Sequence, residues 1–175
     1  MQFETLRTVR STALVCAAVL FATIASAQQM QKVTIKSPAE NSKYVVQQNV
    51  DVGDAPNHIV RIYDVHRTYP TNPPVIAGLR IVEGSDRGVA DYTDGNGNST
   101  VYSVLIAENG DKIFIRASLV AQSAAGKLTA MTSGVITGGT GKLAGIHGVV
   151  RGSANFDPKA GFNEGQVELE YAIGN

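Results

Sequence analysis

Short runs of β-branched and aromatic residues recur along most of this chain, and clusters of Gly, Asn, Asp and Pro separate them. Such alternation predicts strands joined by tight turns. After residue 27 no segment keeps the 3.6-residue apolar period of an amphipathic helix. The sequence therefore predicts an all-β domain of antiparallel strands. The eight expected strands are 58–67, 75–82, 88–93, 100–107, 112–121, 128–137, 146–156 and 166–173.

The densest glycine cluster lies between two of these strands, in residues 135–150. Gly139, Gly141 and Gly145 are spaced in a way that suggests a dinucleotide-binding fingerprint. That fingerprint needs a helix directly after the glycines and an acidic residue about 20 positions on. Residues 148–154 are too rich in glycine and valine for a long helix. We therefore interpret the cluster as a tight corner between two strands, where glycines adopt positive φ and one helical turn fits at 140–143.

Residues 1–27 have the features of a secretory signal peptide. Arg7 and Arg10 precede a short apolar run, and Ala25-Ser26-Ala27 is an A-x-A cleavage site. The apolar run is too short for a stable membrane span, so no membrane anchor is predicted. We expect cleavage after Ala27 and a secreted or periplasmic protein.

The remaining 148 residues have the size of one domain. Removing Arg7, Arg10 and Glu4 with the signal leaves 13 basic and 14 acidic residues, a net charge of −1. Without a basic excess, neither nucleic acid nor an anionic membrane is an expected partner. Cys16 leaves with the signal, which excludes disulfides, thiol catalysis and cysteine–zinc sites in the mature chain. Residues 28–56 are predicted as a polar leader that partly packs on a β-domain of residues 57–175, with an edge strand near 44–46.

The strand at 58–67 carries the most chemistry. One face holds Asp64 and His66 together with His58, and the opposite face includes Tyr63; neither face is plainly apolar. A polar pair suits a strand that lines a cavity, where Asp64 and His66 can act as acid and base. A solvent-facing pair is the alternative. His58 and His66 lie roughly 26 Å apart along an extended strand, so we predict no metal site, and no motif indicates a cofactor.

Further candidate residues follow from position alone. His147 comes directly after the glycine corner and is a candidate for the mouth of a cavity, with a structural histidine as the alternative. Arg116 is a candidate interior charge, although an unpaired buried charge is costly. Asn98 begins a glycosylation sequon, which matters only in a eukaryotic secretory route.

The glycine corner resembles that of the allene oxide cyclase and dirigent-protein superfamily. Residues 136–141, Leu143, Gly145 and Gly148 are similar to the superfamily's pattern of a strand, a glycine turn and a glycine entering the next strand. Residues 63–66 and Pro73 are similar to a first-strand motif of the cyclases and the proline that follows it. The resemblance, over about residues 57–173, implies an eight-stranded antiparallel, calycin-like β-barrel, often trimeric, with an apolar cavity at one end.

The resemblance also implies roles for particular residues. Asp64 and His66 become candidate catalytic residues, and Tyr63, Pro73, His147 and Arg116 candidate ligand-binding residues. We expect an exported β-barrel that binds a small apolar ligand. One alternative is an isomerase or cyclase of the allene oxide cyclase or dirigent type, which acts by shape control with Asp64 stabilising positive charge. Another is a non-catalytic structural or interaction module. Native mass spectrometry of residues 28–175 would report both a retained ligand and a trimer.

Overall fold

The computed structural model describes residues 29–124 and 127–174, and it confirms the all-β prediction. Two short 3-10 turns, η1 (Ala39–Asn41) and η2 (Gly141–Leu143), interrupt the strands. No helix in this part of the chain is long and apolar enough to cross a membrane. The predicted signal peptide lies outside the described residues. The strands are β1 (Gln31–Ser37), β2 (Ser42–Asp51), β3 (His58–Thr68), β4 (Val75–Ile76), β5 (Leu79–Thr93), β6 (Asn96–Ala107), β7 (Lys112–Ala124), β8 (Lys127–Gly139), β9 (Ile146–Asp157) and β10 (Phe162–Ile173).

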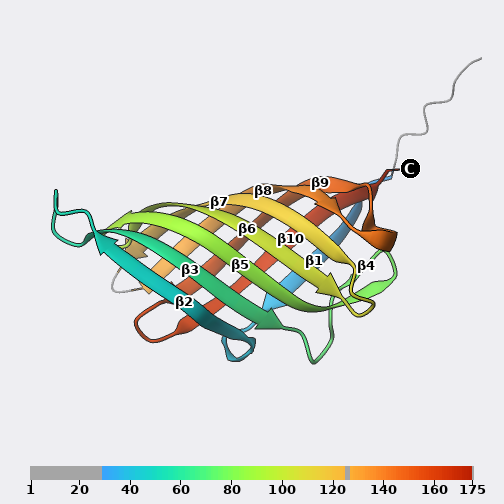
Figure 1. Ribbon diagram of the computed structural model, residues 1–175, viewed down its shortest axis with the longest axis horizontal. Coiled ribbons are helices and arrows are strands. Elements are labelled where there is room, and N and C mark those ends of the chain that lie inside the picture. The colour runs from blue at the N-terminus through green and yellow to red at the C-terminus, as the bar shows by residue number, and fades with distance from the viewer. Residues whose placement is uncertain (1–28, 125–126, 175) are drawn as a thin grey trace, which may run out of the picture.

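Nine of the ten strands form one continuous antiparallel path in the order β1-β10-β9-β8-β7-β6-β5-β3-β2, and β4 pairs with β5 alone. From β5 to β10 every strand pairs with the next one along the chain, as expected for hairpins. The path curls, and Figure 1 shows β1 and β10 behind β2, β3 and β5. Both ends of the path come from the N-terminal segment, because η1 joins edge strand β1 to edge strand β2.

The predicted closure into an eight-stranded barrel is wrong. Within residues 29–124 and 127–174 no backbone ladder joins β1 to β2. Side chains bridge the gap instead: an Nη2 hydrogen of Arg67 on β3 is donated to Oδ1 of Asn163 on β10 over 2.8 Å. The Asn163 Nδ2 amide donates in turn to the hydroxyl of Tyr44 on β2 over 2.9 Å. The curled sheet is thus held together at its seam by side-chain hydrogen bonds and not by strand pairing.

Two further predictions about the strands differ from the structure. The edge strand expected near residues 44–46 is present as part of β2. The leader also contributes β1, so the sheet extends across the predicted boundary at residue 57. The sequence predicts a break between strands 75–82 and 88–93, where Gly84, Ser85 and Asp86 favour a turn, but these residues lie inside the continuous strand β5. Gly84 pairs with Arg67 on one side and Leu105 on the other. Strand pairing on both edges therefore overrides the local turn preference of Gly, Ser and Asp.

The interpretation of the glycine cluster as a corner is confirmed. β8 ends at Gly139, one turn of 3-10 helix follows, and β9 begins at Ile146. Gly145 has φ of +76°, and a Cβ there would lie 2.6 Å from the Gly174 carbonyl oxygen. Leu143 from the helical turn is fully buried beneath the corner. The glycines therefore serve chain reversal and close backbone packing.

Two apolar clusters fill the inside of the curled sheet. The larger includes residues of β4 and η2, which lie at the right-hand end of the sheet in Figure 1. Its largest fully buried side chains are Ile35, Ile76, Ile81, Ile113, Leu143, Ile146 and Leu169. The smaller contains Tyr92 and Phe156, whose rings are stacked with centroids 6.4 Å apart. Members of both clusters line one interior pocket.

Candidate functional site

The interior pocket has a volume of about 120 Å³ and is bounded by residues from most of the long strands. One wall, here called the polar wall, is formed by side chains of β2, β3, β5, β6 and β10. Its residues are Tyr44, Tyr63, Arg67, Asp86, Ser103 and Asn163. The rest of the lining is largely apolar and includes Val65, Val101, Leu105, Ile115, Ala117, Leu119, Val150, Ala154 and Phe156. The pocket is the size of a single aromatic ring and smaller than the roughly 300–1,000 Å³ of drug-sized ligand sites.

β3 directs Arg61, Tyr63, Val65 and Arg67 into the pocket. Tyr63 lies opposite Gly88 on β5, and a Cβ at Gly88 would lie 2.4 Å from the Tyr63 ring. The glycine therefore leaves the space that the ring occupies. The Tyr63 hydroxyl reaches the Ser99 hydroxyl on β6 at 2.9 Å, which satisfies the polar end of the buried side chain.

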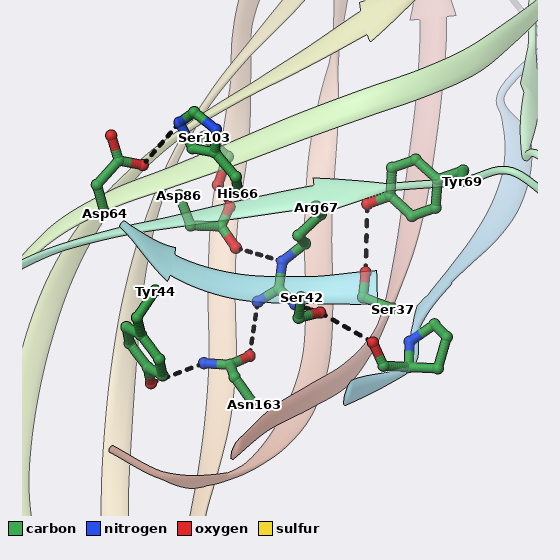
Figure 2. Close-up of polar contacts among 11 residues, drawn as sticks. Ser37, Ser42, Tyr44, Asp64, His66, Arg67, Tyr69, Asp86, Ser103 and Asn163 are labelled. Carbon is green, nitrogen blue, oxygen red and sulfur yellow. Dashed lines mark hydrogen bonds and ion pairs between the residues drawn. The ribbon is translucent and has the colours of Figure 1, made fainter. Parts of the chain in front are cut away.

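An ion pair forms the centre of the polar wall. Nε of Arg67 on β3 donates to Oδ2 of Asp86 on β5 over 2.8 Å, and the Ser103 hydroxyl donates to Oδ1 of Asp86 over 2.6 Å. The other guanidinium nitrogens of Arg67 donate to Ser42 over 2.7 Å and to Asn163 over 2.8 Å. Figure 2 shows Asp86, Ser42 and Asn163 around Arg67. Each guanidinium nitrogen and each carboxylate oxygen thus has a partner, as a buried charge pair requires.

Burial shapes the protonation of the polar wall. Burial disfavours the charged form of Arg67, but the negative charge and hydrogen bond of Asp86 outweigh it and raise the pKa of the guanidinium. Burial also raises the pKa of Tyr63 and of Tyr69, whose hydroxyl lies 3.2 Å from that of Ser37. The two phenols are therefore neutral at physiological pH and act as hydrogen-bonding groups, not as acids.

Asp64 and His66 do not face the pocket, so their expected inward orientation is wrong. Tyr63 and Val65 take the inward positions, and the alternation of the strand turns Asp64 and His66 to the outer face. Figure 2 shows them pointing away from the Arg67 group. His66 Nε2 lies 3.6 Å from Oδ1 of Asp64, whose Oδ2 accepts a hydrogen bond from Nε of Arg87 over 3.0 Å. Asp64 and His66 therefore lie on the outer face of the sheet, where they cannot act as acid and base on a ligand in the pocket.

The other predicted binding residues divide in the same way. Tyr63 lines the pocket, whereas Pro73, Arg116 and His147 do not. Arg116 is exposed on the outer face of β7, with its guanidinium 5.9 Å from the centre of the Tyr102 ring. His147 is exposed, and its Nδ1 lies 3.0 Å from the Gly145 carbonyl oxygen. The expected interior position of Arg116 is therefore wrong, and His147 lies at the surface beside the backbone of the glycine corner.

Sequence reasoning missed the residues that make the polar wall. Arg67 and Asp86 are 19 positions apart, and only the pairing of β3 with β5 brings them together. A signal was present in β3 itself, because Arg67 shares a strand face with Tyr63 and Val65. The pairing partner of such an arginine, however, cannot be read from a single strand.

A second polar cluster lies outside the pocket, where the β2–β3 turn meets the sheet. His58 Nε2 lies 2.8 Å from Oδ1 of Asp91, and Nδ1 is within hydrogen-bond distance of Asp54. The hydrogen bond to Asp91 and then that to Asp54 raise the pKa of His58, and the bond to His58 lowers the pKa of Asp54. Among the described residues no group of three or more His, Cys, Asp or Glu is placed to hold a metal ion.

The hydrogen bonds of His58 that hold the β2–β3 turn against the sheet should depend on pH. The pKa of His58 is raised above its ordinary value of about 6.5. The stability that the charged His58 gives to the folded turn is therefore fully present below about pH 6.5 and is lost as pH rises through the raised pKa. The lowered pKa of Asp54 adds a contribution that is lost only in acid. We expect the amides of residues 52–58 to be better protected from hydrogen exchange at pH 5.5 than at pH 8.5, after correction for intrinsic exchange. His58→Gln should remove the difference, and an unchanged difference in that variant would contradict this account.

The outer face of the sheet carries exposed apolar side chains. Ile62 on β3 and Val89 on β5 are direct partners across the ladder and are each about half exposed. Tyr102 on β6 lies beside them and is 55 % exposed. Such a face is compatible with association, and the predicted homotrimer stays a prediction.

Comparison with known proteins gives a distant structural likeness. No protein-family model and no curated protein matches the sequence. Among solved structures, the chain is similar to a pterocarpan synthase dirigent protein with a TM-score of 0.48 and 12% sequence identity, over 94% of this chain and 100% of that one. Likeness at this level does not assign the chain to a family, and the superfamily resemblance remains an interpretation of its glycine corner and β3 motif.

Proposed function

We propose that this protein binds a small, mainly apolar molecule in its interior pocket. The observation that carries the proposal is a mostly apolar space of about 120 Å³ bounded on one side by an ordered polar wall. An apolar cavity of about 150 Å³ can hold benzene in a protein core. At about 120 Å³ the pocket is somewhat smaller, so one aromatic ring or a short branched chain is the largest ligand expected, with any polar atom at its edge turned to the polar wall.

The geometry favours binding over acid–base catalysis. General acid–base chemistry needs a group that can take up or release a proton at the substrate. Asp86 is the carboxylate of the pocket lining, and Arg67 and Ser103 occupy its two oxygens. The lining tyrosines keep their protons because burial raises their pKa. An isomerase or cyclase that acts by shape alone is the second candidate, and in it Asp64 has no part because of its outward position.

Filling the pocket should abolish binding. Ala117 is a buried, inward-facing residue of β7, and a leucine at this position extends into the space that a ligand needs. We expect Ala117→Leu to lower the affinity for benzene at least tenfold, measured by ligand-observed NMR titration of residues 28–175. The neighbouring Ser118 is exposed, so Ser118→Leu adds the same side chain to the outer face and should leave the affinity unchanged. Equal affinities of Ala117→Leu and the unmodified protein would refute the pocket as the binding site.

A further inference from the structure

The charges that line the pocket do not cancel. They are Arg67 and Asp86, which neutralise each other, and Arg61, which lies on the same face of β3. The two arginines are six positions apart, a distance of about 20 Å along a strand. The pocket therefore has one net positive charge, located well away from the buried ion pair.

Arg61 is held in place but is not neutralised. Its Nε donates to Oδ1 of Asn49 on β2 over 2.9 Å, which fixes the plane of the guanidinium. The ion pairs of the described residues do not include Arg61, and its two terminal nitrogens donate to no acceptor in this part of the chain. The side chain is half-buried, so solvent screens its charge less than that of a surface arginine. A fixed fork with free donors is suited to a bidentate carboxylate.

The surroundings of Arg61 do not supply an internal anion. Its positive charge acts on the hydroxyls of Tyr44 and Tyr92, both in the pocket lining, and tends to lower the pKa of each. Burial has the larger opposite effect, so the pKa of both phenols is raised and both remain neutral. Neutral phenols can add hydrogen bonds to an anion at the guanidinium, and their rings offer apolar contact to the rest of the ligand.

We infer that the pocket takes a monoanionic ligand, a small aromatic or branched carboxylate, whose carboxylate binds the free side of the Arg61 guanidinium while its apolar body enters the cavity. The inference rests on the proposed binding function and narrows it to a ligand class. A dianion would leave one charge without a partner, since the lining has a single unpaired cation. A neutral apolar molecule would leave the guanidinium donors to water.

Benzoate and benzamide test this choice, because they have the same ring and nearly the same shape but differ in charge at neutral pH. We expect residues 28–175 to bind benzoate at least tenfold more tightly than benzamide in a calorimetric or NMR titration at low ionic strength. Arg61→Gln should remove the preference and keep the affinity for benzamide within about twofold. Arg61→Lys, which retains the charge but not the fork, should restore part of the preference.

A matched control removes an equal charge elsewhere. Arg116 is exposed on the outer face, so Arg116→Gln should preserve the benzoate preference. Binding of benzene together with equal affinities for the two probes would overturn the inference and leave the binding function standing. A benzoate preference that survives in Arg61→Gln with unchanged thermal stability would also overturn it. Failure of benzene, benzoate and benzamide alike to bind would overturn the binding function itself.

Discussion

Gly148→Ala is expected to destabilise the protein by more than about 4 kcal/mol, or to prevent folding altogether. Gly148 has φ of +155°, at the edge of a region that L-residues rarely occupy. An added Cβ would lie 2.1 Å from the Glu170 carbonyl oxygen on β10. Since the backbone fixes the position of a Cβ and the carbonyl oxygen belongs to the backbone of the paired strand, no side-chain rotation can relieve the overlap. Strands β9 and β10 would have to separate near the glycine corner.

Gly138→Ala separates the two causes. Gly138 has a similar φ of +149°, but a Cβ there has no atom within 4 Å. It should therefore incur only the conformational cost, about 1–3 kcal/mol. Urea unfolding of both variants gives the comparison, with the yield of folded protein as the readout if Gly148→Ala does not fold. Equal destabilisation would mean that close contact with β10 is not what requires glycine at 148.

Asp86→Ala is expected to lower the free energy of unfolding by about 3 kcal/mol, because it leaves the Arg67 charge inside the sheet without its partner. The Arg67 and Asp86 side chains are only 12% and 25% exposed, so water compensates poorly for the loss. Asp86→Ala also frees the Ser103 hydroxyl, which donates to the same carboxylate. Equilibrium unfolding at pH 7 measures the effect.

Asp64→Ala is the matched control, because Asp64 and Arg87 form the corresponding pair between the same two strands on the outer face. Although the Asp64 side chain is only 15% exposed, that of Arg87 is 57% exposed, so water can replace the carboxylate at the guanidinium and the loss should cost at most about 1 kcal/mol. In addition, Oδ1 of Asp64 is buried without a hydrogen-bond partner among the described residues. Removing this oxygen also removes the cost of its desolvation, which offsets part of the loss. A larger loss in Asp64→Ala than in Asp86→Ala would contradict the placement of the two pairs.

The strand pattern and the glycine corner could be predicted from the sequence because their signals are local. Turn residues fix where most hairpins reverse, and the glycines at 138–148 are needed for positive φ and close backbone approach. The leader was underestimated for a local reason too. β2 is mostly exposed and polar at an edge of the sheet, so its alternation gives little burial signal.

The residues of the site could not be predicted because their contacts join strands that are far apart in the sequence. Burial favours the apolar face of a strand, and β3 has two mixed faces. Its inward face carries Arg61 and Arg67, which hydrophobicity alone assigns to solvent. Arg67 is tolerated inside because β5, β6, β2 and β10 supply Asp86, Ser103, Ser42 and Asn163, directly or through a shared partner. None of these pairings can be recognised before the strand order is known.

The exposed apolar side chains of the outer face and the pocket inside are separate surfaces of the same sheet. Ile62, Val89 and Tyr102 point outward from strands whose next residues line the interior. A small apolar probe can therefore meet either surface. The position at which such a probe binds distinguishes a ligand carrier from a module that works through its exterior.

Methyl NMR of residues 28–175, labelled at alanine and methionine and titrated with benzene, locates the binding position directly. Ala117 and Ala154 lie in the pocket lining, whereas Met131 is 68% exposed on the outer face of β8. We predict saturable shift changes and ligand contacts at the methyl groups of Ala117 and Ala154, with Met131 unchanged. Shifts at Met131 alone, or none at the two alanines at saturating benzene, would contradict an interior binding site.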